Sequence, residues 1–239
     1  MKKLLSFLLV LLMLVGCSLK QEPEVEEPTI EEPVGPVEPV AGGWKINAEL
    51  PEMNDAIFDK ARQGIDGASY SPLFILGTQV VAGTNYEYFC YSKPVVPNAT
   101  PSFKVVTVYR GLGDDPEISI LNIEDFDVTN YIDDQGETTP SGTMGGFTEV
   151  EELPNFLNDE ENVIFEKAFE GLDGVGYTPV AKLASQVVAG TNYAFLAMGK
   201  IISAEPQTHF YVVNIYNDLE GNATVNNVCC LNLANFNAK

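Results

Sequence analysis

One segment of this chain occurs twice, and the repeat constrains the fold more than any other feature of the sequence. Residues 57–86 (IFDKARQGIDGASYSPLFILGTQVVAGTNY) align without a gap on residues 164–193 (IFEKAFEGLDGVGYTPVAKLASQVVAGTNY). The eight residues QVVAGTNY are identical in the two copies. A period near 107 residues predicts a tandem of two whole domains, because solenoid repeats are much shorter.

The similarity continues on both sides of this segment. GGW at 42–44 matches GGF at 145–147, and we align ISILNIEDF (118–126) on VCCLNLANF (228–236). The second alignment gives the second copy about three extra residues before its last strand. We therefore predict two domains, 42–128 and 145–239. The polar, Gly- and Pro-containing stretch 129–144 is typical of a linker, so we expect the two domains to fold independently.

Each repeat begins with a helical pattern. Asn158 is a candidate N-cap, and Glu161 follows it by three residues, as in a capping box. Ile164, Phe165, Ala168 and Leu172 then form one apolar stripe at helical spacing. A glycine at 171 favours the end of the helix. The first repeat has the same pattern at Ile57, Phe58, Ala61, Ile65 and Gly64.

After the helix the apolar period changes to two, which predicts strands. If Lys182 faces solvent, alternation puts one set of residues outside and the other toward the helix. The outside set is Val180, Lys182, Ala184 and Gln186, and the helix-facing set is Ala181, Leu183, Ser185 and Val187. We expect a turn at 189–192 and further strands at 193–200, 209–216 and 227–236. The predicted class is α+β: two tandem domains, each with one helix packed on a curved antiparallel sheet of four to five strands.

The N-terminus predicts export and a lipid anchor. Two lysines precede an apolar run at 4–15 that is too short to span a bilayer. Leu14-Val15-Gly16-Cys17 resembles a bacterial lipobox, which implies a signal peptide at 1–16 and lipidation of Cys17; the alternative is an ordinary signal peptide that contains a cysteine. Residues 18–41 hold five prolines and seven glutamates and predict a disordered spacer. We expect the folded domains outside the cytoplasm, extracellular or periplasmic, attached to the cell envelope.

Composition narrows the classes of partner and chemistry. The net charge is −21, which argues against nucleic acid, because phosphate binding needs clustered Lys and Arg. Apart from Cys17, the cysteines are Cys90, Cys229 and Cys230, and His209 is the only histidine. No spacing among them matches a zinc site. We expect no metal, no cofactor and no enzymatic activity, and contact with a membrane only through the lipid.

A glycine pair, a helix and then QVVAGTNY on a hairpin resemble the cystatin superfamily of papain-like cysteine protease inhibitors, and the stefin-type motif in particular. The resemblance covers 42–128 and 145–239. It implies a wedge that fills the protease cleft, made from the glycine segment, the first hairpin and a second hairpin, which we place at 111–117 and 218–224. The protease-binding residues it implies are Gly42, Gly43, Gln79, Val80, Val81, Ala82 and Gly83 in the first domain, and Gly145, Gly146, Gln186, Val187, Val188, Ala189 and Gly190 in the second.

The residue types suit that role. Small apolar side chains at a hairpin tip enter a narrow cleft with little polar desolvation, and a short hairpin loses little freedom on binding. The expected function is therefore a surface-anchored, reversible inhibitor of papain-like cysteine proteases with two sites per chain. The Pro-Trp that many family members carry in the second hairpin is missing here. The alternative function is a non-inhibitory surface binding module that uses the same fold.

Overall fold

The computed structural model describes residues 43–47, 55–132, 148–149, 157–203 and 206–237. The first repeat forms an antiparallel sheet in the order β1-β2-β3-β4-β5, with one helix between its first two strands. Its elements are β1 (Trp44–Ile46), α1 (Ala56–Ala61), β2 (Ala68–Val81), β3 (Gly83–Pro94), β4 (Ser102–Arg110), β5 (Ile118–Phe126) and the 3₁₀ turn η1 (Val128–Tyr131).

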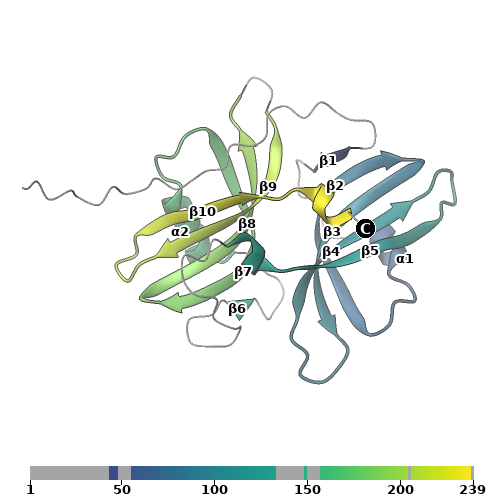
Figure 1. Cartoon of the computed structure of the whole chain (residues 1–239), viewed down its shortest axis with the longest axis horizontal. Helices are drawn as coiled ribbons and strands as arrows, with labels where there is room; N and C mark the ends of the chain where they lie inside the picture. The colour runs from purple at the N-terminus through teal and green to yellow at the C-terminus, as the bar shows by residue number, and fades with distance from the viewer. Residues whose placement is uncertain (1–42, 48–54, 133–147, 150–156, 204–205, 238–239) are drawn as a thin grey trace, which may run out of the picture.

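The second repeat builds a second antiparallel sheet with the same connectivity, in the order β10-β9-β8-β7-β6. Its edge strand β6 has only two residues. The elements are β6 (Thr148–Glu149), α2 (Asp159–Ala168), β7 (Val175–Val188), β8 (Gly190–Ile201), β9 (Thr208–Asn217), β10 (Ala223–Cys230) and the 3₁₀ turn η2 (Leu233–Asn237). Figure 1 shows the second sheet on the left and the first on the right.

Different caps start the two helices. Asn158 accepts a hydrogen bond from the backbone N–H of Glu161, and the Glu161 side chain accepts one from the backbone N–H of Asn158, so the predicted capping box is confirmed. Asp55 caps α1 by accepting from Ile57 and Phe58. The second helix consequently starts earlier and has ten residues, whereas α1 has six. Leu172, predicted on the apolar stripe, lies beyond α2 and is exposed.

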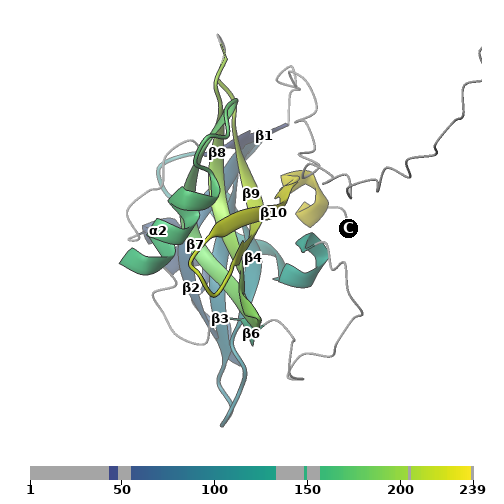
Figure 2. The same cartoon turned by 90° about the vertical axis from the view of Figure 1, so that its left-hand side faces the viewer.

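Each sheet is buried on both faces. Phe58 and Ala61 of α1 pack on the outer face of the first sheet, and Ile164, Phe165 and Ala168 of α2 pack on the outer face of the second. The inner faces pack on each other, with the second sheet in front of the first in Figure 2. This inner cluster is the largest core of the described chain, with ten buried residues from the first repeat and eleven from the second.

The predicted α+β class is therefore wrong. The described chain is mostly β, with two antiparallel sheets and α-helix confined to six residues in α1 and ten in α2. The prediction treated each unit as a helix on a sheet whose other face meets solvent. That face is instead the largest apolar interface of the molecule. Burial of both faces requires strands that are apolar on both sides, which the helix-centred interpretation did not consider.

The predicted faces of β7 are also wrong. Lys182 forms an ion pair with Glu161 of α2, so its side chain lies on the helix side of the sheet. Leu183 and Ala184 are both buried in the inner cluster, although they are adjacent. Bulges between Pro179 and Ala181 and between Lys182 and Ala184 interrupt the alternation, and each extra residue reverses the faces beyond it.

The two repeats contact each other in a reciprocal way. The side-chain amide of Asn122 in β5 donates to the carbonyl oxygen of Phe236 in η2, at 2.8 Å. The amide of Asn227 in β10 donates to the carbonyl oxygen of Tyr131 in η1, at 3.4 Å. Asn122 pairs with Thr107 and Asn227 with Asn214, at matching places in the two sheets. This exchange is the pattern of a two-fold, isologous interface inside one chain.

The shared core does not fit independent folding of the repeats. Phe74 of β2 stacks on Phe210 of β9, with ring centroids 5.7 Å apart. Val128 and Ile132 are buried in the inner cluster, so the ordered chain of the first repeat runs past residue 128. Either repeat alone would expose this large apolar face to water, which is unfavourable.

Candidate functional site

The first hairpin of each repeat closes over a single residue. Val81 ends β2 and lies opposite Gly83, which starts β3, so only Ala82 stands between the strands. Val188 and Gly190 lie opposite each other in the same way around Ala189. The predicted turn at 189–192 is thus too long, because Gly190, Thr191 and Asn192 already belong to the returning strand.

Valine side chains are the exposed part of each tip. Val80 is 74% exposed and Val187 is 77% exposed, while Val81 and Val188 are about half as exposed. Ala82 and Ala189 are exposed too. The same pattern in both repeats leaves an apolar projection in water at each tip, which is typical of a surface that binds another molecule.

Glutamine at the start of the string has a structural role. Gln79 accepts a hydrogen bond from the side-chain amide of Asn85 across the hairpin, at 2.8 Å. Gln186 and Asn192 form the same bond at 2.7 Å. The amides hold the two strands together just below the tip. Among the predicted contact residues, the valines and the alanine are therefore the ones presented outward.

Glycine is required at the tip by close packing. Gly83 has a φ of +135°, and a Cβ added there would lie 2.5 Å from the carbonyl oxygen of Arg110. At Gly190 the φ is +122°, and a Cβ would lie 2.4 Å from the carbonyl oxygen of Asn217. No side chain fits at either position without a backbone shift.

The N-terminal segment of the first repeat lies beside its tip. Gly43 precedes β1, and Trp44 is paired with Gln79, the first residue of the predicted hairpin motif. Trp44 is partly buried against the inner cluster, so it does not project as part of the wedge. The other predicted residues of this kind, Gly42, Gly145 and Gly146, lie outside the described residues, as does Cys17.

The second turns carry two residues that the sequence analysis missed. Leu112 between β4 and β5 is 77% exposed, and Leu219 between β9 and β10 is 83% exposed. Each is a single leucine among glycine and acidic residues, and this was the signal available in the sequence. Exposed leucine beside an exposed valine pair gives each repeat two apolar projections at one end.

The predicted alignment of the second turns is wrong. Val108 pairs with Ile120 and Ile215 with Val225, so Ile120 corresponds to Val225 and not to Cys230. The second turn spans 218–222 in the second repeat and 111–117 in the first, so it is two residues shorter and not three longer. The residues shared by 118–126 and 228–236 had suggested an alignment that the strand pairing does not support.

Charges surround the second turns. Asp115 of the first turn lies 3.5 Å from the Lys60 ammonium of α1, and Asp114 and Glu117 are exposed. In the second repeat the hydrogen bonds that Asn222 and its neighbours donate hold the pKa of Asp218 below its usual range. The carboxylate of Asp218 therefore stays ionised and fixes the turn. An apolar projection bordered by carboxylates suits an apolar cleft with a cationic rim.

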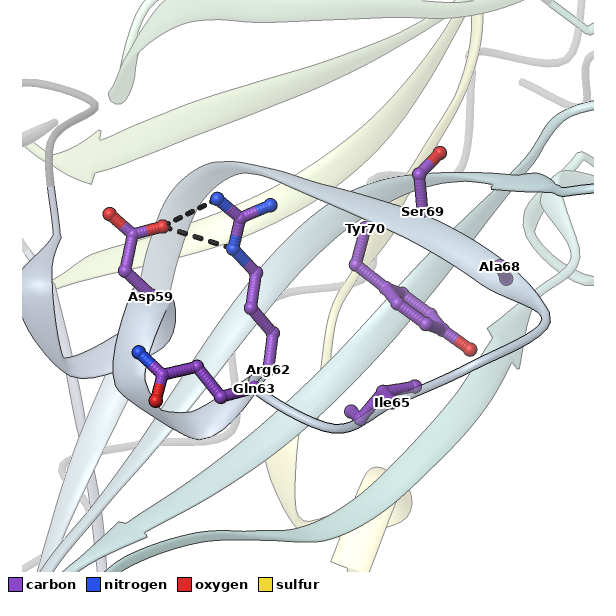
Figure 3. A pocket seen from close by; sticks show the side chains of 7 residues that line it. All are labelled: Asp59, Arg62, Gln63, Ile65, Ala68, Ser69 and Tyr70. Carbon is purple, nitrogen blue, oxygen red and sulfur yellow. Dashed lines mark hydrogen bonds and ion pairs between the residues drawn. The ribbon is translucent and has the colours of Figure 1, made fainter.

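A hollow of about 410 Å³ lies at the end of α1, away from the tips. Figure 3 shows Arg62 turned toward Asp59, with Tyr70 and Ile65 on the other side of the space. In the second repeat the residue aligned with Arg62 is Phe169, whose ring packs on Tyr177 at 4.7 Å. The hollow is thus the space that a phenyl ring fills in the other repeat.

The described residues hold no group of His, Cys, Asp and Glu side chains that could bind a metal ion. No helix in the described ranges is long and apolar enough to cross a membrane. No protein-family model matches the chain, and no curated protein matches it significantly. The tips and second turns are therefore the candidate site on geometry alone.

Proposed function

We propose that this protein is a reversible inhibitor of papain-like cysteine proteases. Each repeat would bind through one edge, which we define as its first-hairpin tip (80–83 or 187–190) together with its second turn (111–117 or 218–222). The observation that carries the proposal is the pair of rigid, one-residue tips, each with exposed valine and alanine. The resemblance of QVVAGTNY to the cystatin motif names the class of partner. A tip held by a cross-hairpin amide pair loses little freedom on binding.

The mechanism requires no covalent step. The tip would enter the apolar active-site cleft and exclude substrate, while the exposed leucine of the second turn contacts the cleft beside it. Burial of one valine or leucine side chain contributes about 1.5–3 kcal/mol, so two valines and a leucine supply roughly 4.5–9 kcal/mol before the costs of association. Association itself costs about 4–15 kcal/mol, so these three side chains supply only part of the binding free energy and the remaining contacts of the edge must supply the rest.

The arrangement of the sheets supports two separate sites. In Figure 1 the β9–β10 turn lies at the left end of the molecule and the β4–β5 turn at the right end. Each turn is joined to the tip of its own repeat, because Tyr109 contacts Ala82 and Tyr216 contacts Ala189. The two edges thus point away from each other, and we expect two protease molecules per chain.

Substitution of Val80 and Val187 by aspartate tests this function. In a cleft the new carboxylate would be desolvated without a partner, which costs several kcal/mol and lowers affinity more than a hundredfold. On the exposed tip of the free protein the change should alter stability by less than about 0.5 kcal/mol. Titration of papain should give two molecules bound per wild-type chain, one for each single variant and none for the double variant.

Val95 supplies the matched control. It is 72% exposed in the β3–β4 connection, at the far end of the strands from the tip, so Val95→Asp should leave inhibition unchanged. A folded double tip variant that still inhibits fully would exclude the wedge mechanism. If the wild-type protein fails to inhibit several papain-like proteases, the non-inhibitory binding module becomes the better description.

We also propose that the protein is exported and anchored by lipid on Cys17. The lipobox-like residues at 14–17 and the acidic spacer support this location. Cys17→Ala should move the protein from the membrane fraction to the medium, or leave the precursor unprocessed. Detergent-dependent membrane association that persists in this variant would contradict the proposal.

A further inference from the structure

A tyrosine joins the two turns of each binding edge. The hydroxyl of Tyr109, one residue from the end of β4, donates to the carbonyl oxygen of Ala82 at 2.6 Å. Tyr216 of β9 makes the same bond to Ala189. In both repeats donor and acceptor are 27 residues apart. The bond connects the apex of the first hairpin to the strand that leads into the second turn.

Glycine and tyrosine form one unit at this place. A Cβ at Gly83 would lie 2.7 Å from Cε2 of Tyr109, and a Cβ at Gly190 would lie 2.9 Å from Cε2 of Tyr216. The missing side chain therefore lets the ring lie against the tip and bring its hydroxyl to the alanine carbonyl. The glycine of the repeated string is needed for this contact as well as for its positive φ.

The second turn is held from its other side by the helix. The Lys60 ammonium of α1 donates to the carbonyl oxygen of Pro116 at 3.5 Å. At the aligned position Lys167 of α2 donates to the carbonyl oxygen of Gly221 at 3.4 Å. Helix, second turn and hairpin tip are thus linked in the same order in both repeats.

We propose that Tyr109 and Tyr216 are positioning residues that hold the tip and the second turn as a single rigid edge. The effect of these tyrosines on protease binding rests on the proposed inhibitory function. Their effect on the order of the hairpin tip does not depend on that function. Removing the hydroxyl frees the alanine carbonyl and lets the apex leave its bound shape. The apparent affinity is the affinity of the bound shape multiplied by the fraction of molecules that keep that shape.

Tyr216→Phe isolates the hydrogen bond, because the phenyl ring keeps its packing against Gly190. We expect amide hydrogen exchange at 188–190 to accelerate three- to tenfold in the free protein, the size of effect that one intramolecular hydrogen bond supports. Exchange at 81–83 should not change. With the first site silenced by Val80→Asp, affinity for papain should fall measurably but by no more than this factor, mainly through slower association, because affinity follows the fraction of molecules in the bound shape.

Tyr70→Phe is the control, because Tyr70 lines the hollow near α1, away from both tips; it should alter neither exchange at the tips nor affinity. Unchanged exchange at 188–190 in Tyr216→Phe would overturn the positioning role. Faster exchange with unchanged affinity in an inhibiting protein would overturn its importance for binding. A wild-type protein that does not inhibit papain refutes the proposed function instead, and hydrogen exchange still decides whether the tyrosine orders the tip.

Discussion

Phe165→Ala tests whether the two repeats unfold as one unit. Phe165 lies in α2 and is 2% exposed, with its ring 5.6 Å from Phe195 and 4.9 Å from Phe169. Every buried residue in its cluster belongs to the second repeat. Loss of a buried phenylalanine side chain costs about 3–5 kcal/mol. This is a large part of the roughly 5–15 kcal/mol that stabilises a typical domain.

The response of the first repeat decides the question. Val106 of β4 is buried on the helix side of the first sheet, and Val213 of β9 is its aligned partner in the second. If the inner cluster makes one cooperative body, both amides should lose the same protection against hydrogen exchange. A loss of 3–5 kcal/mol corresponds to about two to four orders of magnitude in exchange rate.

Urea unfolding provides the second measurement. With a slope of about 2 kcal/mol per molar urea, the midpoint by circular dichroism should fall by roughly 1.5–2.5 M in a single transition. Val163→Ala is the matched control, since Val163 lies on the same helix and is 48% exposed; it should change little. Unchanged protection at Val106 in Phe165→Ala, with two separate unfolding steps, would refute the cooperative body.

Three further predictions concern stability. Glu161→Ala should lower the free energy of unfolding by about 2–4 kcal/mol in urea titrations, because it removes the capping box and leaves the Lys182 ammonium without its carboxylate. Adding Lys182→Ile to this variant should recover part of the loss, since the aligned residue of the first repeat is Ile75. Burial and the hydrogen bond that the Tyr88 hydroxyl donates to Asp55 raise the pKa of Tyr88. The contribution of the neutral phenol to stability is therefore complete below about pH 10 and is lost as the pH rises further. Of the ten tyrosines in the chain, fewer than ten should ionise before the fold is lost, as measured by absorbance at 295 nm. Gly190→Ala should cost about 1–3 kcal/mol, because alanine is strained at positive φ and meets the carbonyl of Asn217; a thermal midpoint equal to that of wild type would contradict this.

Local features were predictable from the sequence, because they depend on neighbouring residues. The cap at Asn158 and the existence of the QVVAG hairpin follow from spacing and turn chemistry, and the structure confirms them. The resemblance to the cystatin motif, not the spacing, placed the valines at the hairpin; the period-two alternation wrongly turned Val187 toward the helix, whereas this residue is exposed. The bond from Tyr216 to Ala189 spans 27 residues, and no local pattern indicates it.

The pairing of the sheets could not be predicted from periodicity. Adjacent Leu73 and Phe74 are both buried in the inner cluster because a bulge separates Pro72 from Phe74. A period-two analysis assigns such neighbours to opposite faces and therefore predicts one wet face. The register of the last strand could not be predicted either. Sequence similarity aligned 118–126 with 228–236, whereas the pairing of Val225 with Ile215 fixes the position of β10.

The reciprocal contacts of Asn122 and Asn227 have an evolutionary consequence. In an association of two identical chains, any substitution at the interface appears on both sides of the axis at once. Here each position exists once, so the halves can diverge: Phe74 stacks on Phe210, while the residue aligned with Phe74 in the second repeat is Ala181. Because both halves belong to one chain, one half can change its tip or its turn while the other does not, and the ratio of the two halves stays one to one.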